Sequence, residues 1–489
     1  MLSNDIIFSS VRELGNKIRT RQLSSTELTE AYLTRLETIG PKLGAVVTVT
    51  RKLAMQQAAA ADKEIKAGHY RGPLHGIPYG IKDAFSAKGY PTTWGIGPYK
   101  DRVFDYDSTV VTMLRDAGAI LIGKLAMVEL VGGLGYDGAD ASFTGPGRTP
   151  WNPDYWSGGS SSGPGAATSA GLVAFSIGGE TGGSILSPSN NCGLAGMRTT
   201  YGRVSRAGGV TLSWSLDKVG PMCRAADDVG LVLAAVAGYD PLDPATVKRP
   251  FVYTEPSAAT KRYQIGIIKG SYENVQPEVR ANFEQSVKVL SEFADVKHDV
   301  EMPDYPYAAI LATVMGAEAA EAFEELIDTG QMREMANQQD RVNGYARKMI
   351  FAVDYIRAQR VRRPARLALE KLLGQYDAVI GPTSGSVAAS ATGTFAGRND
   401  PPAAPKPGET RPVTVALTGP GNVAGVPAIS VPNGFGQHGL PSGIQFMGPT
   451  WSEKTLIDIA VQYQKRTDWH KRQPPIDAWL KSQKAAAGA

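Results

Sequence analysis

The stretch from Gly158 to Gly209 reads GGSSSGPGAATSAGLVAFSIGGETGGSILSPSNNCGLAGMRTTYGRVSRAGG. It holds fourteen glycines and a dense set of serines, yet one apolar run, Gly171–Ile177, interrupts it. Because a glycine-serine linker would carry no such run, we expect a buried strand here. The glycines around it indicate backbone positions that need a positive φ or the close approach of another group. This stretch therefore predicts a folded core and not a linker.

Helices and buried strands alternate along the rest of the chain. Residues 108–117 predict a short helix, and residues 119–122 (AILI) then predict a buried strand. A similar apolar strand is expected at 377–380, after a helical segment. Near the N-terminus a capping box, with Ser24 as the cap and Glu27 reaching back, predicts another helix. This alternation is typical of an α/β layer architecture.

The composition excludes several classes of protein. The chain has 489 residues, of which 42% are apolar and 20% charged, and its net charge is only +4. That charge is too small to indicate a nucleic-acid partner or an acidic membrane. Two cysteines, Cys192 and Cys223, cannot staple a chain of this size, so a reducing compartment is expected. The N-terminus shows no signal-peptide pattern and no apolar run is long enough to span a membrane, which predicts a cytoplasmic protein.

Three short motifs imitate other enzyme classes. Gly118–Lys124 nearly matches a phosphate-binding loop, but a leucine follows where a serine or threonine must bind magnesium. Gly133–Gly138 has dinucleotide-type glycine spacing, but no helix is expected after it. Gly159–Gly163 fits the nucleophile elbow of α/β-hydrolases, with Ser161 as the nucleophile. That esterase-type alternative needs an acid and a histidine downstream, and the whole chain has only 5 histidines.

A set of ordered motifs resembles the amidase signature enzymes. Four of them lie in the glycine-rich stretch and its flank: Ser157–Gly163, Gly178–Ile185, Cys192–Gly196 and Tyr201–Ser205. Others lie outside it: Gly76–Asp83, which is similar to the family's lysine motif, Asp217–Pro221, Ala424–Pro432 and Gly439–Gln445. Several motifs that agree in order are a far stronger signal than any one of them. The resemblance implies an α/β fold with a large, mostly parallel or mixed central sheet covered by helices on both faces.

The resemblance covers most of the chain and also suggests its organisation. We expect a single domain over residues 1–489, with the signature core at about 72–230. The similarity is weakest between about 241 and 375, and an inserted lobe is expected at about 240–375. A segment rich in proline and turn-forming residues predicts a flexible loop at about 391–412. Whether that loop gates a binding site is left open by the sequence.

The resemblance also implies a catalytic triad. By position in the motifs, Ser184 is expected to be the nucleophile, Ser160 the bridging serine on a cis peptide, and Lys82 the base. A lysine acts as a base only when it is neutral, so its pKa must fall from about 10.4 through burial or a nearby cation. The apolar run Ile77–Ile81 before the lysine is consistent with such burial.

Further residues would support that triad. The glycines Gly182 and Gly183 allow backbone N–H groups around Thr181 to converge as an oxyanion hole. Ser161 is expected to form a hydrogen bond within the proton relay. Taken singly, each of these residues has an ordinary structural role, as a turn, a helix cap or a surface side chain. Only the joint pattern favours the catalytic interpretation.

The substrate is predicted from a departure from the family's pattern. Where relatives commonly carry an arginine after the nucleophile, this chain has Leu186 and Ser187, which predicts a neutral, apolar amide or carbamate. Six aromatic residues near the motifs are candidates for an apolar pocket: Tyr79, Phe85, Trp94, Trp151, Tyr155 and Trp156. No cofactor or metal is expected, and the chain is predicted to act as a monomer or homodimer. The alternative is a glutaminase subunit of an amidotransferase, which delivers ammonia to a partner.

Overall fold

The computed structural model describes residues 2–256, 262–395 and 416–487, without the side chains of 483–487. Most of the flexible loop predicted at 391–412 therefore lies outside the described residues, which reach it only as far as Phe395. Within the described ranges, no helix combines the length and the apolar character needed to cross a membrane.

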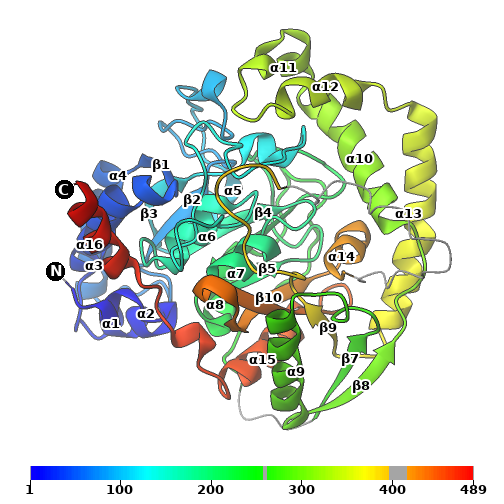
Figure 1. Ribbon diagram of the computed structural model, residues 1–489. Helices are drawn as coiled ribbons and strands as arrows, with labels where there is room; N and C mark the ends of the chain where they lie inside the picture. Colours follow the sequence, from blue (N-terminus) through cyan, green and yellow to red (C-terminus); the bar gives the residue numbers. More distant parts are fainter. Residues whose placement is uncertain (1, 257–261, 396–415, 488–489) are drawn as a thin grey trace.

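One mixed sheet of eleven strands runs through the described part of the chain (Figure 1). Its strands, in spatial order, are β1 (Val46–Val49), β3 (Ile120–Leu125), β2 (Pro78–Lys82), β4 (Phe175–Glu180), β6 (Lys218–Cys223), β5 (Ala195–Arg198), β10 (Ala428–Phe435), β11 (Pro441–Met447), β9 (Ala378–Pro382), β7 (Tyr263–Ile268) and β8 (Ala294–Val300). Strand β2 pairs in parallel with β3 and with β4, whereas β4 and β6 are antiparallel. The expected α/β fold with a large mixed sheet is confirmed.

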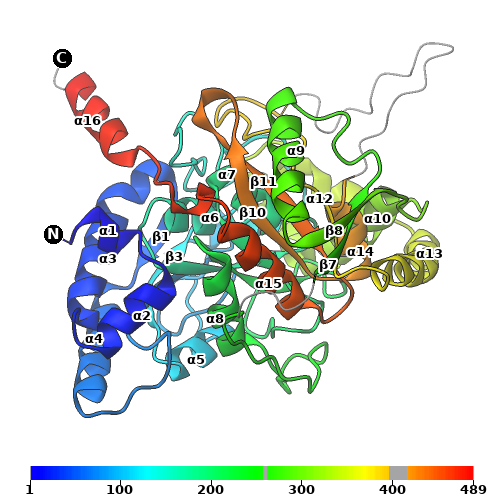
Figure 2. The ribbon, with the colours of Figure 1, turned by 90° about the horizontal axis from the view of Figure 1, so that it is seen from below.

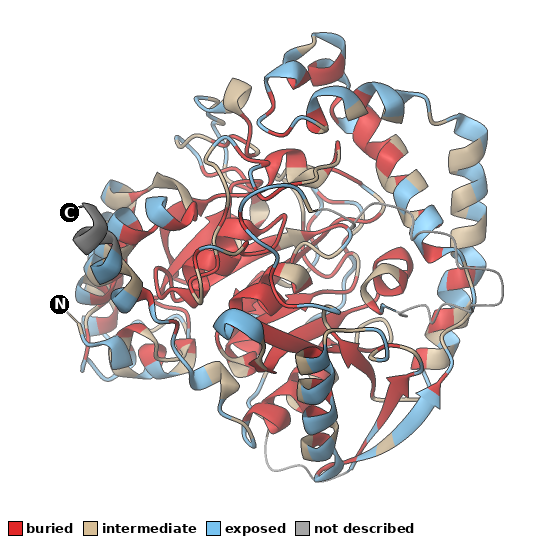
Figure 3. Cartoon of the chain, in the orientation of Figure 1, coloured by how far each residue is buried: buried red, intermediate tan, exposed pale blue. Residues whose placement is uncertain are grey.

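Helices cover this sheet on both sides. They are α1 (Asn4–Ile7), α2 (Val11–Arg19), α3 (Ser25–Ile39), α4 (Arg51–Lys66), α5 (Thr109–Asp116), α6 (Ser162–Ser169), α7 (Leu186–Cys192), α8 (Ala226–Val236), α9 (Pro277–Ser291), α10 (Tyr307–Ala322), α11 (Glu324–Asp328), α12 (Asp340–Lys348), α13 (Ala352–Leu373), α14 (Thr418–Ala424), α15 (Glu453–Gln464) and α16 (Ile476–Ala487). Figure 2 shows strands β10 and β11 between α7 on one side and α15 on the other. Burial is greatest on the sheet and on α6 and α7 (Figure 3), so the glycine-rich stretch forms the centre of the molecule.

Several local predictions are confirmed. Helix α3 begins with the expected capping box, in which the Ser24 hydroxyl accepts from the Glu27 N–H and the Glu27 carboxylate accepts from the Ser24 N–H. Residues 120–125 overlap the segment whose sequence nearly matches a phosphate-binding loop, and they form strand β3 instead. Because a strand pairs its amide groups with its neighbours, it offers no cradle of free N–H groups to a phosphate.

The segment expected to be an inserted lobe consists of two parts. Strands β7 and β8, with α9, extend the edge of the main sheet beyond β9. Helices α10 to α13 lie to one side of the sheet: α11 and α12 are at the top of the molecule in Figure 1, and α10 and α13 are on its right. The division of the chain into a core and a lobe stays a prediction.

A buried ion pair beside the centre of the sheet provides a test of this fold. Asp83 follows β2, and its Oδ1 lies 2.6 Å from Nζ of Lys124 on β3, with both side chains fully buried. We expect Asp83→Ala to lower the free energy of unfolding by about 3–5 kcal/mol, because it leaves a buried ammonium without its counter-ion. The measurement is unfolding in urea.

The matched control is Asp354→Ala, which removes an exposed partner of Arg357 on α13. Exposed ion pairs contribute about 1 kcal/mol or less, so this variant should unfold close to the parent protein. Equal midpoints for the two variants would contradict the account of the Asp83 pair.

Candidate active site

Lys82 ends the central strand β2 and is fully buried. Its Nζ lies 2.8 Å from the Ser160 Oγ and 3.3 Å from the Gly179 carbonyl oxygen. Burial lowers the pKa of Lys82 to about 7, although the negative charges of Asp217 and Glu180 act in the opposite direction. Because its hydrogen-bond partners are neutral, this lysine can lose its proton near neutral pH without breaking an ion pair.

The serine loop before α6 brings Ser160 to that amino group. The peptide bond between Gly159 and Ser160 is cis, as expected, and Ser160 is buried. Ser161 connects this loop to the next motif: its N–H donates to the Ser184 carbonyl oxygen at 3.2 Å. The Ser161 hydroxyl lies 3.2 Å from the Gly179 carbonyl oxygen, which Lys82 also contacts. The structure thus brings Lys82, Ser160, Ser161 and the backbone of Ser184 into one cluster.

A glycine turn carries Ser184 from the end of β4 to the start of α7. Gly183 adopts a φ of 135°, a conformation that favours glycine. In the described part of the chain, the N–H groups of Gly182, Gly183 and Ser184 have no hydrogen-bond partner. Free N–H groups on one turn are what an oxyanion hole requires.

Two carboxylates hold this turn in place. The Glu180 carboxylate accepts from the N–H groups of Ile185 and Leu186, at 2.8 and 3.0 Å. At the other end of the turn, the Thr181 hydroxyl donates to Asp217 at 2.5 Å. The turn is therefore fixed on both sides of Gly182 and Gly183.

A cavity of about 700 Å³ opens in front of Ser184 and is called the Ser184 cavity below. Thr181, Gly182 and Gly183 line it together with Ser184. Its apolar lining includes the aromatic rings of Tyr136, Trp156 and Phe395, and the last two rings lie 4.6 Å apart. Lys82 and Ser160 are buried and do not line it. This volume is typical of a pocket for a small organic molecule.

One expectation about the lining is wrong, and a second is met only in part. Leu186 is buried, and it packs with Leu417 and Val379 in the core instead of facing the cavity. Since α7 begins at Leu186, its first turn directs that side chain inward, and Ser187 lines the cavity in its place. Of the six aromatic residues suggested by the sequence, only Trp156 lines the cavity. The others are Tyr79, Phe85, Trp94, Trp151 and Tyr155.

Sequence reasoning missed one wall of the cavity. Gln339, Asn343 and Arg347 reach it from α12 and its N-cap, far along the chain from Ser184. No local motif marks these residues, and they lie where the resemblance is weakest. Their spacing of four residues, which places them on one helix face, was the only available signal.

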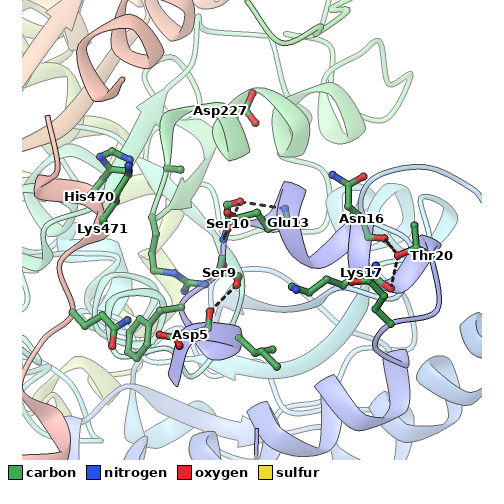
Figure 4. Close-up of a pocket in the computed structure, with 16 residues that line it drawn as sticks. Asp5, Ser9, Ser10, Glu13, Asn16, Lys17, Thr20, Asp227, His470 and Lys471 are labelled. Atoms are coloured by element: carbon green, nitrogen blue, oxygen red, sulfur yellow. Dashed lines mark hydrogen bonds between the residues drawn. The ribbon is translucent and has the colours of Figure 1, made fainter. Parts of the chain in front are cut away.

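A second cavity, of about 810 Å³, lies between the N-terminal helices and the segment before α16 (Figure 4). Its polar groups form local hydrogen bonds: the Ser9 hydroxyl donates to the Asp5 carbonyl, and the Thr20 hydroxyl to the Asn16 carbonyl. None of the predicted site residues lines it. Size alone therefore does not identify the functional cavity.

The family model described as Amidase matches residues 27–457, most of the chain. The chain belongs to the amidase signature family. It is 34% identical to a glutamyl-tRNA(Gln) amidotransferase subunit from Thermosynechococcus vestitus, over 96% of this chain and 100% of that protein. The corresponding protein from Acinetobacter baumannii is also 34% identical, over 96% of this chain and 98% of that protein. The solved native peptide amidase of Stenotrophomonas maltophilia is 31% identical, with a TM-score of 0.78, over 96% of this chain and 98% of that one.

The membership confirms the expected resemblance and the class of enzyme that acts on carbon–nitrogen bonds. The esterase-type alternative, which depends on Ser161 and a histidine, gains no support from the cavity. All five histidines lie in the described ranges, and none of them lines the Ser184 cavity.

Proposed function

We propose that this chain is a serine-dependent amidase that hydrolyses a small amide, aryl amide or carbamate and not a peptide bond. The observation that carries the proposal is the buried Lys82 amino group, 2.8 Å from the Ser160 hydroxyl. In this proposal Ser184 is the nucleophile, Ser160 relays protons and Lys82 is the base. The enzyme acts in the cytoplasm, as a monomer or homodimer, without a nucleic-acid or membrane partner and without a cofactor.

Acylation begins with a proton transfer along the relay. Neutral Lys82 takes the proton of the Ser160 hydroxyl while Ser160 takes the proton of the Ser184 hydroxyl. The Ser184 oxygen attacks the carbonyl carbon of the substrate, and the carbonyl oxygen becomes an oxyanion. The N–H groups of the turn at Thr181, Gly182 and Gly183 stabilise that charge, which the ground-state carbonyl carries only in part.

Collapse of the intermediate breaks the carbon–nitrogen bond. The proton returns from Lys82 through Ser160 to the nitrogen, which leaves as a neutral amine. Water then repeats the sequence: the relay takes a proton from water as its oxygen attacks the acyl group on Ser184. As the bond to Ser184 breaks, the relay returns that proton to the Ser184 oxygen and the acid is released. Ser161 supports the relay through the Gly179 carbonyl, which it shares with Lys82.

The cavity walls support an apolar group on the substrate. The rings of Tyr136, Trp156 and Phe395 surround the cavity beside the glycine turn. Aromatic walls favour a planar or aliphatic apolar group through burial and ring contacts. Esters are further candidates, because their acylation uses the same steps and an easier leaving group.

We expect Ser184→Ala, Ser160→Ala and Lys82→Ala each to lower kcat/KM on a p-nitroanilide substrate by at least about 10³-fold, since members of one relay act as a unit. The matched controls are Ser291→Ala and Lys288→Ala on α9, both at exposed positions. The measurement is release of p-nitroaniline by the purified variants. If Ser184→Ala or Lys82→Ala hydrolysed the substrate as fast as the parent enzyme, the assignment of Ser184 as nucleophile and Lys82 as base would be wrong.

The second candidate function is that of an amidotransferase component, which the identity of 34% to two such proteins favours. Such a component would release ammonia from glutamine for a partner protein. The amidase proposal predicts that the chain, purified alone, hydrolyses anilides and leaves glutamine intact. If the chain instead releases ammonia from glutamine, and the rate rises when the other subunits of an amidotransferase are added, the second function is the correct one.

A further inference from the structure

The α12 wall of the Ser184 cavity carries an arginine with unused hydrogen-bonding capacity. Gln339, Asn343 and Arg347 lie four residues apart and all line the cavity. Gln339 donates to Asp137 at 3.1 Å, which engages its amide. In contrast, the side chains of Asn343 and Arg347 form no hydrogen bond or ion pair with any residue in the described ranges.

The guanidinium group of Arg347 lies close to two glycines. Its Nε is buried without a hydrogen-bond partner among the described residues. A Cβ atom at Gly316 on α10 would lie 3.0 Å from Nη1, and a Cβ atom at Gly135 would lie 3.3 Å from Nη2. Two glycines therefore leave room on both sides of the group, where a side chain would press on it.

The guanidinium group of Arg347 has no ion-pair partner among the described residues. The carboxyl group that acts on it electrostatically is that of Asp340, on the same helix. Burial, and then the neighbouring Glu129, raise the pKa of Asp340 well above its ordinary value, which favours its uncharged form. Arg347 is also the only charged residue among the described residues that line the cavity.

From this geometry we infer that Arg347 is a specificity-determining residue that binds a carboxylate on the amide substrate, with Asn343 beside it. A guanidinium matches a carboxylate with two parallel hydrogen bonds, and a partly desolvated site strengthens them. This inference rests on the proposed amidase function and revises the expected substrate: an apolar body against the aromatic rings, with an acidic group at the α12 wall. The prediction of a neutral substrate depended on Leu186, which faces the core.

The experiment compares matched substrates. In the first pair the carboxylate is on the acyl side: the mono-anilide of a linear dicarboxylic acid is compared with the same anilide whose free carboxylate is methylated. In the second pair it is on the amine side: an amide of 4-aminobenzoate is compared with the same amide of its methyl ester. In the parent enzyme, kcat/KM for the best carboxylate substrate should exceed that of its ester by about 10-fold or more. In Arg347→Met that ratio should fall to about one, mainly through KM, and Arg347→Lys should keep part of it.

The matched control is Arg363→Gln, at an exposed position on α13, which should keep the parent ratio. Labelling of Ser184 by a neutral sulfonyl fluoride verifies that Arg347→Met is folded. Two results would overturn the inference while leaving the amidase proposal intact. One is that the parent enzyme cleaves the anilide bond equally well with and without a free carboxylate on the substrate. The other is that a preference for the carboxylate survives in Arg347→Met. Failure of every anilide, acidic or neutral, would instead count against the amidase proposal itself.

Discussion

The contact between the Lys82 amino group and the Ser160 hydroxyl, 2.8 Å apart in a buried site, is the interaction on which the rest of the account depends. Lys124, one strand away, is also buried, and burial lowers its pKa as well. The Asp83 carboxylate, 2.6 Å from its Nζ, acts in the opposite direction and favours the charged ammonium. Among the described residues, Lys82 has only a hydroxyl and a carbonyl oxygen as hydrogen-bond partners. Burial therefore lowers its pKa to about 7, where a lysine can exchange a proton.

The fold supplies that environment through the central position of β2. Strands β3 and β4 pair in parallel with β2 on its two sides, so the lysine at its end is enclosed by sheet and by the serine loop. The same end of β4 leads into the glycine turn, which Glu180 ties to the start of α7. Glu180 also accepts from Asn422 at 2.9 Å, which connects the turn to α14. The Glu180 carboxylate thus connects, through hydrogen bonds, elements from distant parts of the chain.

Much of the site could be predicted from the sequence, because its parts lie in short motifs. The capping box at Ser24 and the cis peptide at Ser160 each have a local or family signal, and each is found. The strand expected at 171–177 is found only in part, because β4 begins at Phe175 and continues to Glu180. The direction of Leu186 could not be predicted, since it depends on where α7 begins and what packs against it. Arg347 could not be predicted either. Its place in the cavity depends on how α12 packs beside α10, a contact without a sequence motif.

The most direct test of the central claim is the pH dependence of Ser184 modification. The second-order rate constant for labelling by a neutral sulfonyl fluoride is measured from pH 5 to pH 9, with the modified residue identified by peptide mass spectrometry. If neutral Lys82 is the base, the rate constant rises about tenfold per pH unit up to about pH 7, and is constant above it. A rate constant that does not change between pH 5 and pH 8, or labelling at a residue other than Ser184, would contradict the account.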